Sequence, residues 1–552
     1  MNAQLAAALT RRLPGMNSAA VRTLVRAVVF VVLLSIAYRI GMDLTGRVAH
    51  RPGALAFTAL LTAWAGAFGA ALAFRTYRYH EIWTPIRVLL QGTGLVFFVQ
   101  CLFDAFHPAS FVSNVFTGSY TDARVLIGLA ILSGILAWRR PAFLLPLLLA
   151  YFMFRHRAPA AYGLPATTLD FTTPLDVGAF SILCLLAARA YDALQQSPFK
   201  RVMQSVRLPE DPQHSVGFKK VLWGLVVGMH LGNYFHSALA KIRVGGGDPL
   251  FWVSHNPTER AIAIGLHRFN NPLSQWPWAV DAAYATLHEY HLAFNVFVLG
   301  VQLFSPLSVL SRRSLALFTL CFDLLHLGIY GALGAFFFLW IALNLIILAS
   351  VSRIEKDDYT WDIKITAMAT AVIGYLSFST AQLGWLDGAK VVREVFYART
   401  TDGVLTPAPP AMFGLFAYQI GHGDLYVPDG HFKVRFGGNV DDRRDWEDAD
   451  TCGPKVAREQ FFAPSMEGVH RLVQDADRQL LQRPAVKQLG LFYAYPHHMP
   501  TNPTAFDAFN RLEMRKVASY LYVVESACLK VTGGRPVERI DKRSEFPINV
   551  QR

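Results

Sequence analysis

Polar side chains that can hold or move protons interrupt the most apolar parts of this sequence. One largely apolar stretch, residues 219–253, carries six of them: His230, Asn233, Tyr234, His236, Ser237 and Lys241. An aromatic pair with Trp252 follows. A charged lysine at the centre of a membrane helix costs about 2.5–3.5 kcal/mol. The folded protein must therefore provide partners for these groups.

Two later apolar stretches carry similar residues. In 281–303, His288 and His291 are three positions apart, so one helix would place them on a shared face, with Asn295 one turn further along. In 314–331, Asp323 precedes His326 by three positions. A carboxylate so placed can accept a hydrogen bond from the imidazole and fix its tautomer.

Three interpretations of these side chains remain open. The polar groups of a membrane bundle can hydrogen-bond one another, for about 1 kcal/mol each. Several imidazoles could instead bind haem or a metal, but no HExxH or CxxC motif accompanies them, so no residue is predicted as a metal ligand. The third is an acid/base site, because burial disfavours a charged amine and makes Lys241 a usable base. Alternatively, Lys241 ends a span and extends to the membrane surface.

The composition predicts a polytopic α-helical membrane protein. Of 552 residues, 53% are hydrophobic and only 16% are charged. The basic residues behind the net charge of +13 lie between apolar runs, which favours a role in membrane topology over nucleic-acid binding. About eleven spans are expected, at 27–44, 54–74, 88–106, 123–138, 142–154, 175–190, 221–241, 281–303, 314–331, 334–351 and 365–386.

Lys and Arg are concentrated in alternate turns between these spans, which predicts that the N-terminus is inside and the C-terminus outside. We therefore expect a cytoplasmic segment 1–26, a bundle 27–390 and a soluble domain 391–552. The setting would be a bacterial-type inner membrane with the last domain in the periplasm.

The soluble domain is expected to be of the α+β class. Strands are predicted at 431–436 and 519–524, and helices near 465–482 and 503–516. Cys452 and Cys528 are its only cysteines; they form either a disulfide or two buried thiols. His422, His497 and His498 are weaker site candidates.

The segment NYFHSALAKI and the FWV that follows it resemble the signature of the HTTM and vitamin K-dependent γ-carboxylase superfamily. The matching residues are Tyr234-Phe235, Ser237-Ala238, Lys241-Ile242, Asp248 and Trp252. The likeness continues through SRRSLALF and CFDLLHLGIYGALGAFFFLW, so that it covers about residues 219–351. The carboxylases carry two adjacent lysines, whereas Ala240 precedes Lys241 here.

The resemblance implies a chemistry. A lysine at the position of Lys241 would deprotonate a quinol such as reduced vitamin K or menaquinol. Oxygen then converts the quinol into a stronger base, which removes the γ-proton of a peptide glutamate, and the carbanion captures carbon dioxide. His236 and His326 would assist Lys241 in catalysis. The residues expected to hold the quinol are Tyr234, Trp252, His288, His291 and Asn295.

The expected function is thus a carboxylase-like lyase that modifies a peptide or protein substrate outside the membrane, with lipid and quinone as its other partners. Two alternatives come from other classes. One is a non-catalytic maturation, export or immunity factor for a secreted peptide. The other is a haem- or metal-dependent membrane oxidoreductase.

Overall fold

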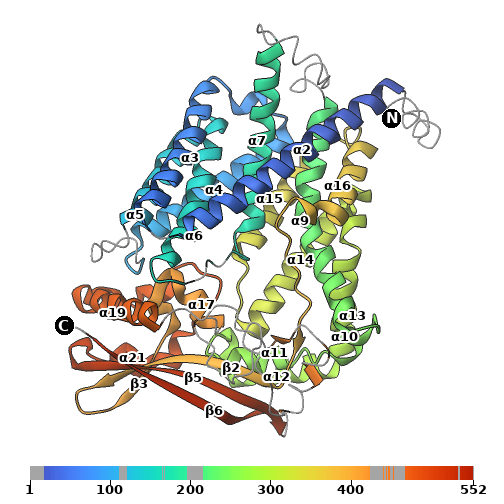
Figure 1. Cartoon of the computed structure of the whole chain (residues 1–552). Helices are drawn as coiled ribbons and strands as arrows, with labels where there is room; N and C mark the ends of the chain where they lie inside the picture. Colours follow the sequence, from blue (N-terminus) through green and yellow to red (C-terminus); the bar gives the residue numbers. More distant parts are fainter. Residues whose placement is uncertain are drawn as a thin grey trace.

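A computed structural model gives the fold of most of the chain. It describes residues 18–51, 53–110, 121–164, 166, 168–195, 216–422, 425, 439–440, 443, 446–447, 452, 466–532 and 535–550. A helical bundle occupies one end of the molecule, and a sheet with short helices closes the other (Figure 1).

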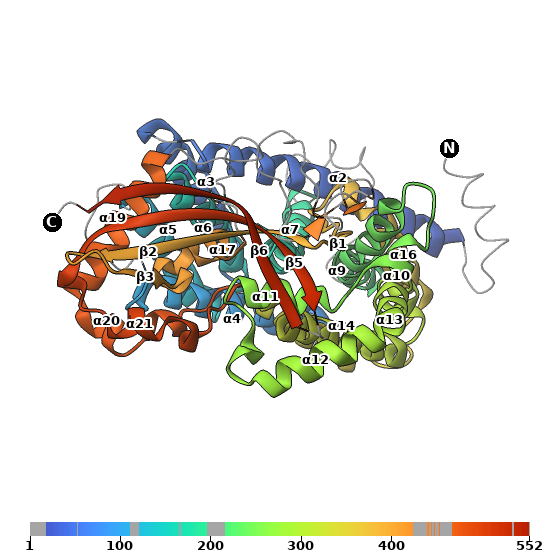
Figure 2. The same cartoon turned by 90° about the horizontal axis from the view of Figure 1, so that it is seen from below.

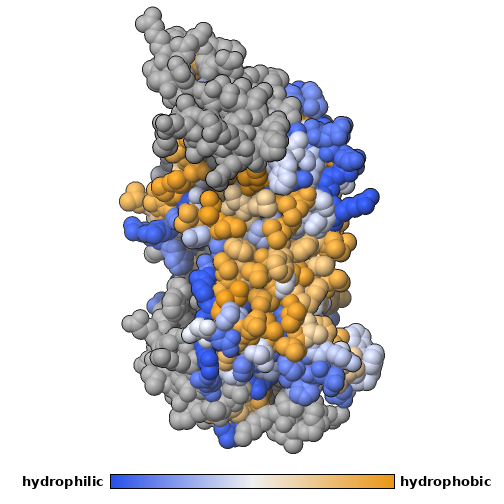
Figure 3. All heavy atoms as spheres, turned by 90° about the vertical axis from the view of Figure 1, so that its right-hand side faces the viewer, coloured by the Kyte–Doolittle hydropathy of each residue, from blue (hydrophilic) through white to orange (hydrophobic). Residues whose placement is uncertain are grey.

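Among the described residues, five helices are long and apolar enough to cross a membrane. They are α2 (Ser18–Ala49), α3 (Ala54–Ala73), α4 (Thr84–Phe106), α7 (Thr172–Gln195) and α14 (Arg312–Leu333). Figure 3 views the side on which α13 lies in Figure 1, and it shows a broad hydrophobic band with hydrophilic side chains above and below. The membrane class predicted from composition is thereby supported, while the number and direction of spans stay predictions.

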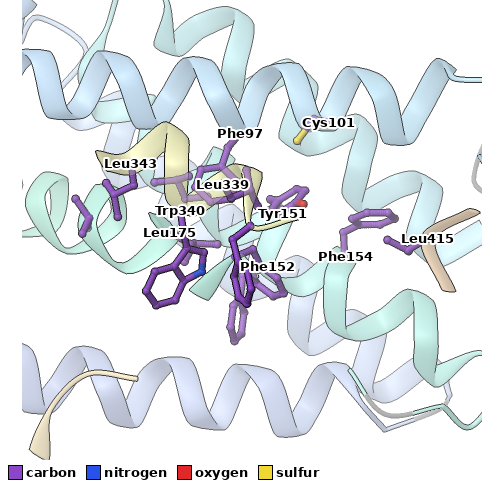
Figure 4. Packing of buried hydrophobic residues seen from close by; sticks show 14 of the residues in the cluster. Phe97, Cys101, Tyr151, Phe152, Phe154, Leu175, Leu339, Trp340, Leu343 and Leu415 are labelled. Carbon is purple, nitrogen blue, oxygen red and sulfur yellow. The ribbon is translucent and has the colours of Figure 1, made fainter. Parts of the chain in front are cut away.

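Most other predicted spans are also helical. The further helices of the bundle are α5 (Thr121–Ala137), α6 (Leu144–Ala160), α9 (Val216–Val244), α10 (Phe251–His255), α11 (Arg260–His267), α12 (Pro277–Glu289), α13 (His291–Leu303), α15 (Phe338–Ser352) and α16 (Trp361–Ile373). The short stretch 142–154 is an inner helix, because α6 buries nearly all of its residues and continues to Ala160. Figure 4 shows its Tyr151 and Phe152 near Phe97 of α4 and Trp340 of α15, and its Phe154 beside Leu415.

Two predicted spans were wrong in detail. The stretch 281–303 is not one helix, because it breaks at Tyr290, where α12 ends and α13 begins after it. Figure 2 shows α12 lying across the end of the bundle. The stretch 365–386 is helical only to Ile373, with one further 3-10 turn at Gly374–Leu376. The residues after this turn are not helical. Their backbone N–H groups instead donate hydrogen bonds to side chains of α9.

The closest packing in the bundle joins α9 to α16. Gly224, Gly228 and Gly232 follow one another at four-residue intervals on α9. A Cβ atom on Gly228 would lie 2.5 Å from the carbonyl oxygen of Ala367, so only glycine permits this approach. Small residues spaced by four are a usual means of bringing membrane helices together. They fix the height and rotation of α9, and hence of its polar side chains.

The C-terminal domain contains a four-stranded antiparallel sheet of order β3-β2-β5-β6. Its strands are β2 (Lys390–Thr400), β3 (Leu405–Ala408), β5 (Val517–Thr532) and β6 (Arg535–Asn549), and a small pair joins β1 (Leu386–Asp387) to β4 (Asn439–Val440). Its helices are α17 (Ala417–His422), α19 (Met466–Gln482), α20 (Pro484–Gln488) and α21 (Asp507–Arg511). Figure 2 shows the long strands curving beneath the helices.

The α+β prediction for this domain is confirmed in part. The strand at 519–524 lies in β5, and the helix at 465–482 is α19. The helix at 503–516 was wrong, since this stretch forms only α21 between two 3-10 turns. The strand predicted at 431–436 and the side chain of His422 lie outside the described residues. Cys452 and Cys528 form the disulfide, with Cα atoms 5.7 Å apart.

Candidate functional site

Most polar side chains of α9 lie on one side of the helix. At 3.6 residues per turn, five of them fall within about 100° of one another: His230, Asn233, Tyr234, Ser237 and Lys241. All five are buried. His236 lies on another side, where a ring nitrogen is 3.1 Å from the carbonyl oxygen of Val372 and the ring packs against Tyr375. The structure therefore directs His236 toward α16 and away from Lys241.

An extended stretch of chain, here called the linker segment (residues 377–385), runs along this polar side of α9. The backbone N–H of Ala381 donates to Asn233 Oδ1 at 2.7 Å. The N–H of Leu383 donates to Ser237 Oγ at 3.1 Å. Lys241 Nζ donates to the carbonyl oxygen of Leu383 at 2.5 Å. Three α9 side chains spaced by four residues thus replace the backbone partners that a helix would have given this segment.

Small residues allow this contact. A Cβ on Gly384 would lie 2.5 Å from the Cβ of Ala240, so the linker segment touches α9 at this point. A longer side chain at position 240 would meet the same backbone. The close approach accounts for the small residue at position 240.

Lys241 is only 5% exposed, so its amine does not extend to the surface as a span-terminal lysine often does. Nζ lies 5.1 Å from the ring centre of Trp252 and 5.8 Å from that of Trp385, so two aromatic rings enclose the amine. Trp252 Nε1 donates to the carbonyl oxygen of Trp385 at 2.6 Å and fixes the two aromatic residues together. Asp387 is close enough to act electrostatically on the amine.

Asn295 stabilises the backbone that follows Trp252. Its Nδ2 donates to the carbonyl oxygens of Val253, at 3.0 Å, and Asn256, at 2.8 Å. Asn256 in turn donates to Asp387 Oδ2 at 3.2 Å and accepts from the Asp387 N–H at 2.8 Å. Asn295, predicted to bind a cofactor, therefore holds the loop that positions Asp387.

The two histidines of 281–303 do not share a helix face, contrary to the prediction, because the break at Tyr290 separates them. The side chain of His288 is 67% exposed, and its Nδ1 lies 3.1 Å from Glu259 Oε1. His291 Nδ1 lies 2.9 Å from the backbone oxygen of His288. These contacts join the two imidazoles to Glu259 and to the end of α12, and among the described residues neither imidazole hydrogen-bonds Lys241.

His326 and Tyr234 belong to a second buried cluster further along α9. Tyr234 stacks on Phe322 with ring centres 3.6 Å apart, and His326 packs against Phe337 at 5.2 Å. Asn344 lies at the centre of this cluster. No role for this residue was predicted from the sequence. Its Nδ2 donates to Asp323 Oδ1 at 2.7 Å and to the Tyr234 hydroxyl at 3.3 Å, and its Oδ1 lies 2.6 Å from His230 Nε2.

The predicted contact between Asp323 and His326 is replaced by the one between Asp323 and Asn344. His326 Nδ1 is buried, with no hydrogen-bond partner among the described residues. Tyr234 and Lys241 are seven residues apart on one side of α9, so the two clusters are about 10 Å apart along the helix. A lone amide within FLWIALNLIIL was the only sequence signal for Asn344.

Within the described residues, no three His, Cys, Asp or Glu side chains gather where they could hold a metal ion.

Searches of protein-family models, curated proteins and solved structures found no match for the chain. The geometry thus provides one buried amine in an aromatic cage, a nearby carboxylate, and a second polar and aromatic cluster with an available imidazole nitrogen.

Proposed function

We propose that this protein is a membrane enzyme in which Lys241 acts as a base toward a lipid-soluble quinol. One observation carries the proposal: the amine is buried, and Leu383 O is its one hydrogen-bond acceptor among the described residues. An ammonium group has three N–H donors, so burial with one acceptor favours the neutral amine. A neutral amine in a dry site can accept a proton from a hydroxyl group.

The surrounding residues suit such a substrate. Trp252 and Trp385 offer aromatic faces beside the amine, and the carboxylate of Asp387 would stabilise the ammonium once a proton has arrived. His326 Nδ1 is a second group available to a hydroxyl. A bound quinol would supply, with oxygen, the strong base needed to carboxylate a peptide glutamate with carbon dioxide, as the γ-carboxylase resemblance implies.

In this proposal the C-terminal domain lies outside a bacterial-type inner membrane and presents the peptide. The sheet begins at Leu386, directly after the linker segment that receives Lys241. A substrate bound by the domain would therefore reach the end of α9 that carries the amine.

The test is Lys241→Met, which keeps most of the side-chain length and removes the amine. We expect quinol-dependent carboxylation of a glutamate-containing peptide to fall by about 100-fold or more, the usual contribution of a general base. The measurement uses purified protein in vesicles with reduced vitamin K or menaquinol and labelled bicarbonate.

Lys364→Met is the matched control, because this lysine also packs against aromatic rings, those of Tyr359 and Trp361. Full turnover by the Lys241→Met protein would refute the proposal. Thermal unfolding of both variants separates loss of chemistry from loss of fold.

A second candidate is a non-catalytic maturation factor for a secreted peptide. It is favoured by the hydrogen bonds of Asn233, Ser237 and Lys241 to the linker segment, which make them structural partners of the backbone. In this case Lys241→Met lowers only the thermal stability, and the purified protein carries a stoichiometric peptide without quinone.

A further inference from the structure

A second basic site lies away from Lys241, between α2, α6, α7 and the start of the linker segment. Its cavity has a volume of about 730 Å³, within the usual range for a small-molecule site. The basic side chains that line it are Arg39, Arg47, His50, Arg51 and His156. Asp43 and Asp176 also line it, so three arginines face two carboxylates.

The carboxylates are already engaged. Arg39 pairs with Asp43 at 3.1 Å and also donates to Ser379 Oγ at 2.6 Å. Asp176 accepts a hydrogen bond from the Tyr38 hydroxyl at 2.7 Å. These contacts leave the remaining arginines without a carboxylate partner in the cavity.

Arg47 and Arg51, at the end of α2, make no side-chain hydrogen bond or ion pair with the described residues. His156 Nε2 is buried and also lacks a partner within that part of the chain. A Cβ on Gly46 would lie 3.4 Å from the His156 ring, so the absence of a side chain at position 46 leaves this imidazole facing the cavity. Two guanidinium groups and a ring nitrogen are thus available to one anion.

Exposed apolar side chains of α2 form a stripe that ends near these groups. Leu33, Ile36, Ile40 and Leu44 are 63%, 45%, 63% and 61% exposed on α2. At about 100° per residue they lie within about 60° of Arg47 around the helix. Figure 1 shows α2 crossing the bundle obliquely, so this exposed stripe runs along a helix that is itself a candidate membrane span. A ligand that fits both parts is anionic at one end and long and apolar at the other.

We propose that the cavity binds the headgroup of an anionic phospholipid, with its phosphate between Arg47, Arg51 and His156 and its acyl chains along α2. Inorganic phosphate could bind the same polar groups, but it has no apolar part to contact the exposed apolar side chains of α2. The proposal is independent of the reaction at Lys241.

The test uses the full chain in phosphatidylcholine vesicles that contain a few per cent of spin-labelled phosphatidylglycerol. The measured quantity is the fraction of label immobilised by the protein. The variant Arg47→Glu/Arg51→Glu should lower the affinity by about 30-fold or more, since each arginine near an anionic lipid contributes about tenfold or less and reversal adds repulsion. Spin-labelled phosphatidylcholine should show no such immobilisation.

Arg75→Glu/Arg139→Glu is the matched control, because both residues follow other apolar helices and lie outside the cavity. It should bind phosphatidylglycerol as the unaltered protein does. Gly46→Leu fills the cavity without changing charge and should also weaken binding, which keeps the test valid if the arginine variant fails to fold.

Equal immobilisation by the unaltered protein and by both cavity variants overturns the proposal. So does an equal loss in the Arg75→Glu/Arg139→Glu control, which would mean that general surface charge attracts the lipid. Displacement of the label by millimolar inorganic phosphate would overturn the assignment to a lipid and leave a free-phosphate site.

Discussion

The fold accommodates buried ionisable side chains in different ways. Lys241 donates to a backbone carbonyl within an aromatic cage. His498 and His497, in the C-terminal domain, are kept neutral: burial lowers the pKa of each imidazole from 6.5 to about 3. The backbone N–H of Met499 donates to His497 Nδ1 at 3.2 Å, which only the neutral ring can accept.

The two histidines make stability depend on pH. Between pH 6.5 and about 3 the unfolded chain binds more protons than the folded one, so stability decreases as the pH falls through this window and is constant above it. The expected slope is about 1.4 kcal/mol per pH unit for each histidine. Thermal unfolding of the purified protein from pH 8 to pH 5 measures it. His497→Gln should reduce the slope, and the less buried His470→Gln should not; an unchanged slope in the first variant would contradict the assignment.

At the scale of elements, α9 is the centre of the bundle. Its glycines bring it against α16, and its polar side holds the linker segment and the cluster around Asn344. The same helix therefore sets the positions of Tyr234 and Lys241. A shift of α9 against α16 would move both.

Gly228→Ala tests this packing. The added Cβ would meet the Ala367 carbonyl oxygen at 2.5 Å, and backbone cannot give way as a flexible side chain can. We expect destabilisation of about 1–3 kcal/mol, as for other overpacked sites, seen as a lower thermal midpoint in detergent. Gly300→Ala in α13 is the control, because a Cβ there meets nothing within 4 Å. Equal midpoints for the two variants would show that the α9–α16 contact is not tight.

A second element-scale feature is the disulfide between Cys452 and Cys528, which are 76 residues apart in sequence. It ties the chain after β4 to strand β5. Such a crosslink restricts the unfolded chain and contributes about 2–4 kcal/mol. Mass spectrometry without reduction should find the two cysteines joined, and Cys452→Ser should lower the thermal midpoint. Cys101→Ala, at a free buried thiol, is the control for loss of a cysteine; two free thiols in the unreduced protein would refute the pairing.

At the scale of the whole molecule, the C-terminal domain is docked on the helical bundle through polar contacts. Tyr495 donates to Asp104 of α4, and Tyr162, after α6, donates to Asp475 of α19 at 2.7 Å. The N–H of Phe336 donates to the His498 carbonyl at 2.7 Å, close to the cluster that contains His326. These contacts thus couple the C-terminal domain to the interior of the bundle.

Tyr495→Phe should loosen this docking. It removes the donor to a buried carboxylate, at a cost of about 1–3 kcal/mol. Hydrogen exchange should become faster in residues 491–502 and at the end of α4. Tyr493→Phe is the control, because its hydroxyl donates to Asn510 within the same domain. If exchange at the end of α4 rises equally in both variants, Tyr495 does not hold the interface.

The membrane class, most helices of the bundle, part of the α+β domain and the need to enclose the polar groups of α9 are predictable from the amino-acid sequence alone. These follow from hydropathy and spacing, which are local. The sequence also singled out Lys241, but as a residue with two possible placements, at the surface or inside.

The hydrogen-bond partners of these polar groups depend on the tertiary structure. Leu383 lies 142 residues from Lys241, and Asn344 lies 114 from His230, so no local pattern could have joined them. The end of α16 at Ile373 also depends on contacts with distant chain, because side chains of α9 bind the backbone that follows it. The break at Tyr290, in contrast, lies in the polar run HEYH at 288–291, which is a local signal. A polar residue within an apolar run is visible in the sequence, and so is the free-energy cost of burying it. The atom that forms its hydrogen bond depends on how the whole chain packs.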